Sequence, residues 1–249
     1  MWRLLVVKLT DLSGALSRVK RLGEAYSTSP LSGGHRAHSV RLAPSWVKHE
    51  TPVQGVDGRL TRQHVLDLAQ KAGDAESCFE VFLHAMAWGY GDNGYGPYRT
   101  DRIAGEIGSA ETCGTFLLNL KNAAASGCGS GYEFLQSNSP KYLGPAFGTK
   151  LLYFVSPIEK RAPILDSVVS GWLWSYGVAT DQESIDSRLY DGDQYARYVD
   201  FVDRSTAGLS IVTDLDDVAD RGFVEYLIFQ DRLFSRAMDA FPQWLHNFE

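Results

Sequence analysis

Lys150 and Asp166 are the two residues of this chain whose types and spacing best suit covalent chemistry. The lysine ends the stretch YLGPAFGTK, residues 142–150, and the aspartate follows sixteen residues later in PILDS. A free amine can attack an electrophilic carbon such as the anomeric carbon of a sugar, and a carboxylate can stabilise the positive charge that develops there. The pair therefore indicates chemistry that separates a nucleobase from its sugar.

A turn and an apolar helix must position the lysine. Gly144 and Pro145 predict the turn, and the run from Leu151 to Val155 predicts the helix that follows it. Lys150 would then lie near the start of that helix among apolar side chains. Burial and the positive end of the helix both disfavour its ammonium form, so we expect the nucleophilic free amine to be accessible there.

Both residues also have ordinary structural explanations. A lysine beside apolar side chains can lay its stem along them and keep its ammonium in water. Asp166 precedes Ser167, Val168 and Val169 and is well suited to cap the N-terminus of a helix. That role is compatible with catalysis. The joint occurrence of the turn, the lysine and the spaced aspartate favours the catalytic interpretation.

The spacing of apolar residues predicts an all-α fold. Helical regions are expected at 61–73, 75–88, 101–136 and 214–241, the third of them as two helices joined near Gly127. Residues 27–60 are rich in Ser, Gly, Pro and His and predict loop. No alternating stretch is long enough to predict a substantial sheet. We divide the chain into an N-terminal segment without assignment, residues 1–60, and one domain over 61–249.

Composition excludes several classes of protein. No apolar run reaches the roughly 18 residues of a membrane span, and the apolar N-terminus is too short for a secretory signal. Three cysteines are too few for a disulfide framework or an iron–sulfur cluster, and the six histidines show no HExxH pattern. We expect a cytoplasmic protein without metal, cofactor or membrane partner.

The charges are distributed unevenly along the chain. The net charge of −6 disfavours a polyanionic partner. However, residues 1–50 carry eight Lys or Arg against three Asp or Glu, and residues 140–163 carry four against one. Acidic residues gather in 181–220, with eleven against three Arg. This asymmetry can give one basic and one acidic face; an uneven spread of solvated charge is the alternative.

The loop from Trp88 to Thr100 combines turn residues with aromatic ones. It contains four glycines and a proline, which demand turns, together with three tyrosines, among them Tyr90 and Tyr95. Either the rings pack the loop internally, or they contact flat bases while Arg99 binds a phosphate.

The stretch PAFGTK, residues 145–150, resembles the hairpin of the helix–hairpin–helix DNA glycosylases, whose turn often reads Pro-Gly-hydrophobic-Gly-x-Lys with an aspartate further on. The match is nearest to the 8-oxoguanine branch, where Gly-Thr-Lys occurs. Together with MAWG and GYGPYR, it makes roughly residues 60–240 similar to a bacterial family described as having the 8-oxoguanine glycosylase fold. Ala146 departs from the pattern, since a glycine there allows close approach of backbone N–H groups to phosphate; Gly144 could restore the turn in a shifted form.

The resemblance implies two helical subdomains around a cleft, with the helix–hairpin–helix motif at about 142–155. It implies that Lys150 is the nucleophile and Asp166 its acid–base and electrostatic partner. Residues expected to contact DNA are Arg99, Gly144, Ala146, Gly148 and Thr149. The target bond lies inside a duplex, so the base must flip out into a pocket. The aromatic candidates for that pocket are Trp88, Tyr95, Phe154, Trp172, Trp174 and Phe229.

Three functions fit these features. The first is a DNA glycosylase, with or without lyase activity, that acts on double-stranded DNA containing a modified base. Its target would be an oxidised purine in DNA repair, or a glucosylated hydroxymethylcytosine in antiviral defence, where relatives with this fold are implicated; the polar segment 181–200 would suit a sugar-reading pocket. The second is a non-catalytic helix–hairpin–helix DNA-binding module, and the third is a structural or regulatory protein without DNA. On DNA we expect association with the nucleoid, and we predict no protein partner.

Overall fold

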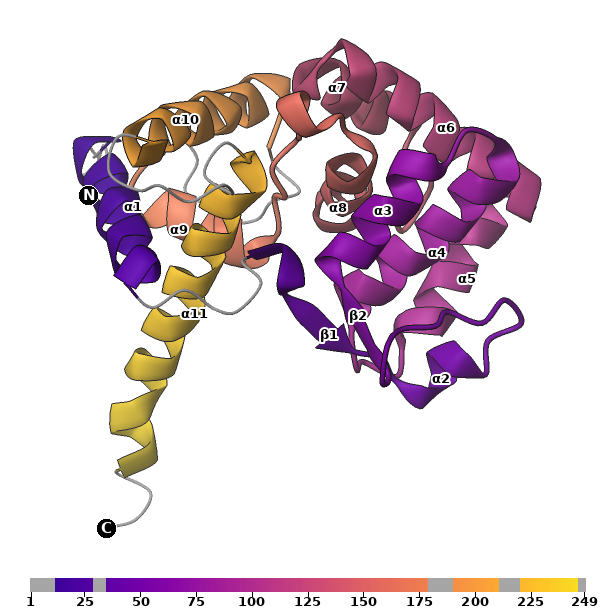
Figure 1. Cartoon of the computed structure of the whole chain (residues 1–249), viewed down its shortest axis with the longest axis horizontal. Helices are drawn as coiled ribbons and strands as arrows, with labels where there is room; N and C mark the ends of the chain where they lie inside the picture. Colours follow the sequence, from indigo (N-terminus) through magenta and orange to yellow (C-terminus); the bar gives the residue numbers. More distant parts are fainter. Residues whose placement is uncertain (1–11, 29–34, 179–189, 211–219, 246–249) are drawn as a thin grey trace, which may run out of the picture.

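The computed structural model describes residues 12–28, 35–178, 190–210 and 220–245 (Figure 1). These residues are mostly helical, as the apolar spacing predicts. The helices are α1 (Leu12–Thr28), α2 (Pro44–Val47), α3 (Arg62–Lys71), α4 (Ala75–Tyr90), α5 (Gly96–Ile107), α6 (Ala110–Ser126), α7 (Cys128–Asn138), α8 (Pro145–Val155), α9 (Ser167–Ser175), α10 (Gly192–Ser210) and α11 (Arg221–Leu245), with the 3-10 turns η1 (His35–Ala37) and η2 (Ile158–Lys160).

One antiparallel hairpin of β1 (Ser39–Arg41) and β2 (Arg59–Thr61) departs from the all-helical prediction. Each strand has three residues. A strand of this length leaves no alternating pattern in a sequence, because the signal needs four to eight residues. The hairpin therefore could not be predicted from periodicity.

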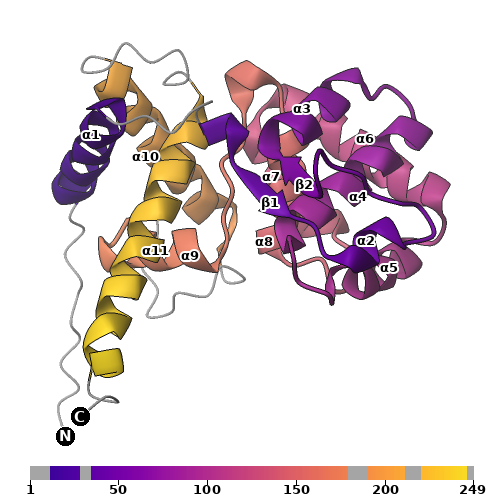
Figure 2. The ribbon, with the colours of Figure 1, turned by 60° about the horizontal axis from the view of Figure 1, so that its bottom comes forward.

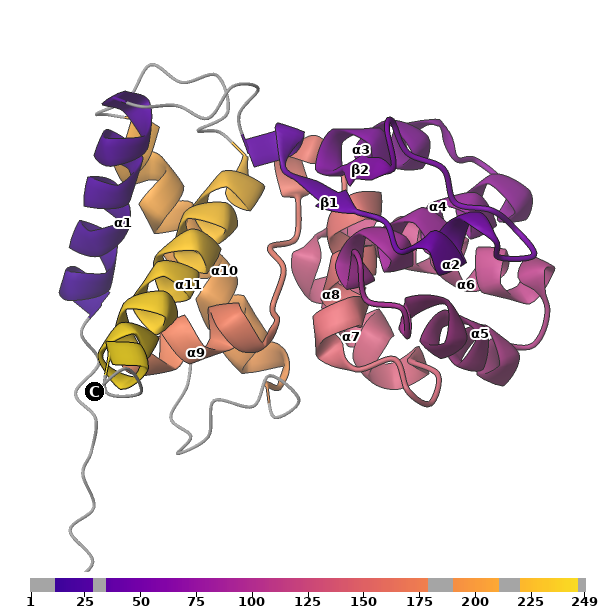
Figure 3. The same ribbon diagram turned by 90° about the horizontal axis from the view of Figure 1, so that it is seen from below.

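The helices gather in two groups. α2 to α8 lie together on one side of the molecule, and α1, α9, α10 and α11 lie on the other (Figures 1 and 3). α4 packs against α3, α6 and α8 in the first group, while α11 packs against α1, α9 and α10 in the second. Figure 2 shows α1, α10 and α11 side by side. The buried apolar side chains of both groups form one continuous core.

Two predicted helix starts are confirmed by their caps. The side chain of Thr61 accepts the N–H of His64 at 3.1 Å at the start of α3. Asp74 and Ser77 form a reciprocal capping box at the start of α4. Each cap satisfies N–H groups that have no partner within the helix.

The region 101–136 contains one break more than predicted. The joint at Gly127 is confirmed, since α6 ends there and α7 begins. A further break lies at Gly108, whose φ of 127° ends α5, and Ser109 caps α6 directly after it. A single glycine within a helical pattern can be tolerated or can end the helix, so this break could not be predicted from the pattern.

The N-terminal segment is more structured than predicted. α1 packs against α10 and α11, and Arg18 donates two hydrogen bonds to Asp231 of α11. Residues 27–60, predicted as loop, contain η1, β1, α2 and most of β2. α11 begins at Arg221 rather than near 214 and runs to Leu245. Residues 29–34 and 211–219 lie outside the described residues.

Asp220 joins three separate segments at the start of α11. Its Oδ2 accepts hydrogen bonds from Arg161 at 2.8 Å and Arg36 at 3.1 Å, and the ring of His35 lies 3.5 Å away. Burial alone would raise the pKa of the Asp220 carboxyl, but the hydrogen bond to His35 and the charge of Arg161 hold it well below its usual range. Asp220 therefore stays ionised and fixes α11 to both η1 and the residues after η2.

We expect Asp220→Asn to lower the free energy of unfolding by about 3 kcal/mol, because it leaves buried cations without their counter-charge. The measurement is urea denaturation at pH 7. Asp200→Asn is the matched control, since it removes an equivalent charge from an exposed pair with Arg204 on α10. That control should cost less than about 0.5 kcal/mol. Equal losses in the two variants would contradict the role given to Asp220.

Candidate active site

Lys150 is buried in the second turn of α8. Pro145 occupies the first position of this helix, where its missing N–H costs nothing, and Gly144 precedes it in extended conformation. The apolar residues after Lys150 are buried, so α8 lies deep in the core with one cation on it. Only 11% of the Lys150 side chain is exposed.

Asp166 caps α9 and pairs with Lys150 at the same time. Its Oδ1 accepts the N–H groups of Val168 at 2.9 Å and Val169 at 3.1 Å. Its Oδ2 accepts a hydrogen bond from the Nζ of Lys150 at 3.2 Å, and the same Nζ donates to the carbonyl of Ala146 at 3.3 Å. The structural and the catalytic interpretations of Asp166 are therefore compatible, because different oxygens serve them.

The environment keeps Asp166 ionised at neutral pH. Burial alone would raise its pKa, but the ammonium of Lys150 and the N–H groups of Val169 and Val168 outweigh this and lower the pKa below the ordinary value. A carboxylate of this kind can stabilise a cation that forms beside it.

Thr149 links the two halves of the pair. Its hydroxyl accepts the N–H of Leu165 at 3.0 Å and donates to the carbonyl of Pro145 at 2.7 Å, so α8 is bonded to the residue directly before Asp166. Tyr195 and Tyr198 on α10 support this segment by donating to the carbonyls of residues 163 and 164. Thr149 was predicted to contact DNA, but its side chain is fully buried, and a contact through its hydroxyl would require this link to break.

The pair lines a small pocket of about 150 Å3 between the two groups of helices. Its walls come from the segment around β1, from α3, α4 and α8, from the residues before α9, and from α11. Of the aromatic residues predicted for a base pocket, Trp88 and Phe229 line it. Phe154 lies behind this wall, with its ring edge-on to Trp88 at 5.4 Å between centroids.

The other predicted pocket residues do not belong to this lining. Trp172 is buried in α9 and donates its indole N–H to Asp231 at 2.8 Å. Trp174 is half-buried on the same helix. Tyr95 precedes α5 and is 69% exposed. No observation assigns these three rings to a base, and their role there stays a prediction.

Arg62 and Glu225 line the same pocket, and the sequence analysis missed both. They form a buried ion pair of 3.0 Å between α3 and α11. A charged residue on an amphipathic helix is normally read as solvated. The available signal is that Glu225 interrupts the otherwise apolar run FVEYLIF, residues 223–229, where a solvated side chain is not expected.

Gly89 provides the space that the lysine needs. A Cβ atom at this position would lie 2.6 Å from the ring of Phe147 and 3.1 Å from Cδ of Lys150. Any side chain here would therefore displace the ring of Phe147 and press against the stem of Lys150. This gives a steric reason for the glycine in the Trp-Gly element.

The hairpin turn between α7 and α8 borders a second, basic pocket of about 460 Å3. Arg99 and Gly144, both predicted to contact DNA, line it together with Arg102 and Tyr142. Arg102 stacks on the ring of Tyr142 at 3.9 Å. No carboxylate lines this pocket, and three tyrosines around it, Tyr95, Tyr98 and Tyr142, are 47–69% exposed.

The backbone of the turn differs from the expected glycine geometry. Tyr142, not a glycine, adopts the left-handed conformation, with φ of 73°. Gly144 has φ of −78° and ψ of 170°, which any residue can adopt. Gly148 is buried and its Cα faces Leu135 of α7, while Ala146 lies in the first turn of α8, where helical N–H groups lack partners. Phosphate binding would therefore rely on the helix start rather than on a glycine-rich turn.

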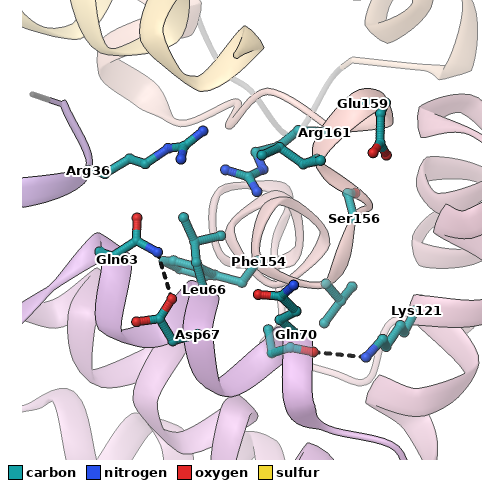
Figure 4. A pocket seen from close by; sticks show the side chains of 13 residues that line it. Arg36, Gln63, Leu66, Asp67, Gln70, Lys121, Phe154, Ser156, Glu159 and Arg161 are labelled. Atoms are coloured by element: carbon teal, nitrogen blue, oxygen red, sulfur yellow. Dashed lines mark hydrogen bonds between the residues drawn. The ribbon is translucent and has the colours of Figure 1, made fainter. Parts of the chain in front are cut away.

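A third pocket, of about 390 Å3, has different chemistry (Figure 4). It lies between α3 and the end of α8 and does not include Lys150 or Asp166. Arg36 and Arg161 point toward it, and both are bonded to Asp220. Gln63 donates to Asp67 at 2.6 Å. Its polar groups are thus largely engaged within the protein.

The described residues contain no cluster of three or more His, Cys, Asp or Glu residues placed to hold a metal ion. Among them, no helix combines the length and the apolarity needed to cross a bilayer.

We expect Thr149→Val to cost about 1–3 kcal/mol of unfolding free energy, because the buried N–H of Leu165 would lose its acceptor. Hydrogen exchange of the Leu165 amide should accelerate. Thr100→Val is the matched control: Thr100 is equally buried, but its hydroxyl donates only to a carbonyl of its own helix, that of Gly96. A loss in the control as large as in Thr149→Val would refute a specific link.

Comparison with known proteins gives one match. A family model described as "Putative 8-oxoguanine DNA glycosylase OGG-like protein" matches residues 33–229. This region contains every residue that lines the 150 Å3 pocket. No protein of curated function and no solved structure matches the chain.

Proposed function

Because the family model covers most of its length, the chain belongs to the OGG family of 8-oxoguanine DNA glycosylase-like proteins, and on this premise we propose that it is a DNA glycosylase whose nucleophile is Lys150. The observation that carries the proposal is the 3.2 Å contact between Lys150 and Asp166 at the wall of a pocket. The two groups of helices would be the two subdomains, with the flipped nucleotide between them.

The reaction requires an amine and a stable negative charge at one sugar. After Lys150 loses a proton, its Nζ attacks C1′ of the deoxyribose, and the bond from C1′ to the base breaks. The electron pair leaves with the base, which takes up a proton. Asp166, ionised at neutral pH, stabilises the oxocarbenium-like sugar as this bond breaks. The amine nitrogen then loses a proton, the bond from C1′ to O4′ breaks and O4′ takes up a proton, which gives a Schiff base that would also permit strand cleavage by a lyase step.

The pocket favours an unadorned base as the target. A cavity of about 150 Å3 suits a ring-sized ligand, whereas pockets for larger ligands measure about 300–1,000 Å3. We therefore infer an oxidised purine such as 8-oxoguanine as the first candidate. A glucosylated hydroxymethylcytosine, the second candidate, would need a wider pocket. Of the segment 181–200, which was predicted to contribute to a sugar site, residues 181–189 lie outside the described residues.

The basic pocket beside the hairpin supports a DNA partner despite the net charge of −6. Arg99, Arg102 and the exposed Lys141 lie near the start of α8. Cations and a helix N-terminus attract phosphate, and exposed tyrosine rings can stack on bases. The phosphate and the base contacts would both lie near the pocket of Lys150. Tyr90 lines the basic pocket and stacks on Phe147, with 4.2 Å between the ring centroids, and Phe147 lies beside the lysine stem.

We expect borohydride to trap a covalent adduct between the protein and a duplex with a modified base, and Lys150→Gln to abolish it. Asp166→Asn should keep the α9 cap, because asparagine caps as well as aspartate, yet lower the rate roughly 10²–10³-fold because it lacks the charge. Thermal stability should also fall, because the buried ammonium of Lys150 loses its counter-charge, so the rate is measured well below the unfolding transition of the variant.

Lys20→Gln, which changes an exposed lysine of α1 that lines none of the three pockets, is the control and should trap normally. Trapping that survives Lys150→Gln would remove Lys150 as the nucleophile. Salt-sensitive DNA binding without an adduct or base release from any modified duplex would favour the non-catalytic module.

The target base can be identified by mass spectrometry of bases released from oxidised genomic DNA and from phage DNA that carries glucosylated hydroxymethylcytosine. We expect release of the oxidised purine, since it is the smaller of the two bases and the pocket is small. Lys150→Gln protein is the control for spontaneous loss. Release of the glucosylated cytosine alone would instead support the defence function.

A further inference from the structure

The pocket of Lys150 contains a second ion pair that the proposed reaction does not use. Arg62 donates to Oε2 of Glu225 at 3.0 Å and to the carbonyl of Gly222 at 3.3 Å. Both side chains are 3% exposed or less. The guanidinium of Arg62 also lies over the rings of Trp88 and Tyr153 at 4.9 and 5.0 Å. The pair is therefore fixed in place at the wall that the lysine shares.

Stability alone is a poor explanation for this pair. Transferring two charges into an interior costs several kcal/mol per ion, and apolar residues of similar size are often equally or more stabilising. The pair instead acts on the charges beside it. The pKa of Glu225 is raised above its usual value: burial raises it most, the charge of Arg62 lowers it, the carboxylate of Asp166 raises it and the ammonium of Lys150 lowers it. Glu225 thus interacts with both members of the catalytic pair.

The remaining titratable groups around the pocket are neutral at pH 7. Burial and the neighbouring Arg62 lower the pKa of His38, from the segment before β1, to about 4. Burial raises the pKa of the tyrosines that face the two pairs from three helices: Tyr153 of α8, Tyr198 of α10 and Tyr226 of α11. The charged groups among the described residues that line the pocket are therefore two cations, Lys150 and Arg62, and two carboxylates, Asp166 and Glu225.

We propose that Arg62 and Glu225 are positioning residues that control the protonation of the lysine nucleophile, with Arg62 neutralising Glu225 so that one carboxylate, not two, retains the proton on Lys150. This inference rests on the proposed function. Without Arg62, Glu225 would need another cation, and Lys150 is the other Lys or Arg among the described residues that line the pocket. Without Glu225, the charge of Arg62 would repel that ammonium.

These two losses have opposite effects on the lysine. Glu225→Gln should move the pH midpoint of single-turnover borohydride trapping about one unit lower, because free amine forms more easily. Arg62→Met should move it about one unit higher. The double variant Arg62→Met/Glu225→Gln should return close to the wild-type midpoint. A purely structural role would reduce the amplitude of trapping at every pH without shifting the midpoint.

Two further variants separate charge from folding. Arg62→Lys keeps the charge and should keep the midpoint. Arg161→Met breaks a different buried pair, with Asp220, outside this pocket; it should lower stability and leave the midpoint unchanged. A shift in Arg161→Met as large as in Arg62→Met would overturn the inference.

A second measurement does not depend on DNA. Lysines can be reductively methylated with a 13C label and followed by NMR against pH, with the Lys150 signal assigned by Lys150→Arg. The same opposite displacements of the Lys150 titration are expected in Arg62→Met and Glu225→Gln. If the wild type traps no duplex but these displacements occur, the glycosylase proposal fails and the charge coupling stands. If the wild type traps and the midpoints of both variants equal its own, the coupling alone is wrong.

Discussion

The arrangement depends most on the carboxylate of Asp166, because one side chain satisfies two separate demands. One oxygen accepts the N–H groups that begin α9, and the other accepts a hydrogen bond from the ammonium of Lys150. A lysine with only 11% of its side chain exposed would be strongly disfavoured without such a partner. The charge that starts a helix is thus also the charge that allows this lysine to be buried.

The surrounding elements hold this carboxylate at a fixed distance. Thr149 bonds α8 to the residue before Asp166, and two tyrosines of α10 bond to the same short segment. Gly89 leaves room on the opposite side for the lysine stem. The pair of Arg62 and Glu225 follows the same rule, since each buried charge in the pocket has a counter-charge within hydrogen-bonding distance.

Sequence reasoning was effective where the signals were local. Lys150 and Asp166 lie sixteen residues apart, and a turn, an apolar helix and a capping position identify them. Arg62 and Glu225 lie 163 residues apart, and nothing local shows that two charged residues will meet in the interior. Aromatic side chains were hardest to assign, because the type of ring does not show whether it lines a pocket or packs in the core. Trp172 of α9, for example, donates a hydrogen bond to Asp231 of α11. Fold class was predictable because helical periodicity needs no long-range contact.

α1 lies outside the region that the family model matches, yet Arg18 bonds to Asp231, within two turns of Glu225 and Phe229 on the same helix. Asp231 in turn accepts the indole N–H of α9. A chain that began at residue 33 would retain the complete pocket lining but leave one flank of α11 without its neighbour. The region matched by the family model therefore does not contain all the residues that support the pocket, because α1, which packs against α11, lies outside it.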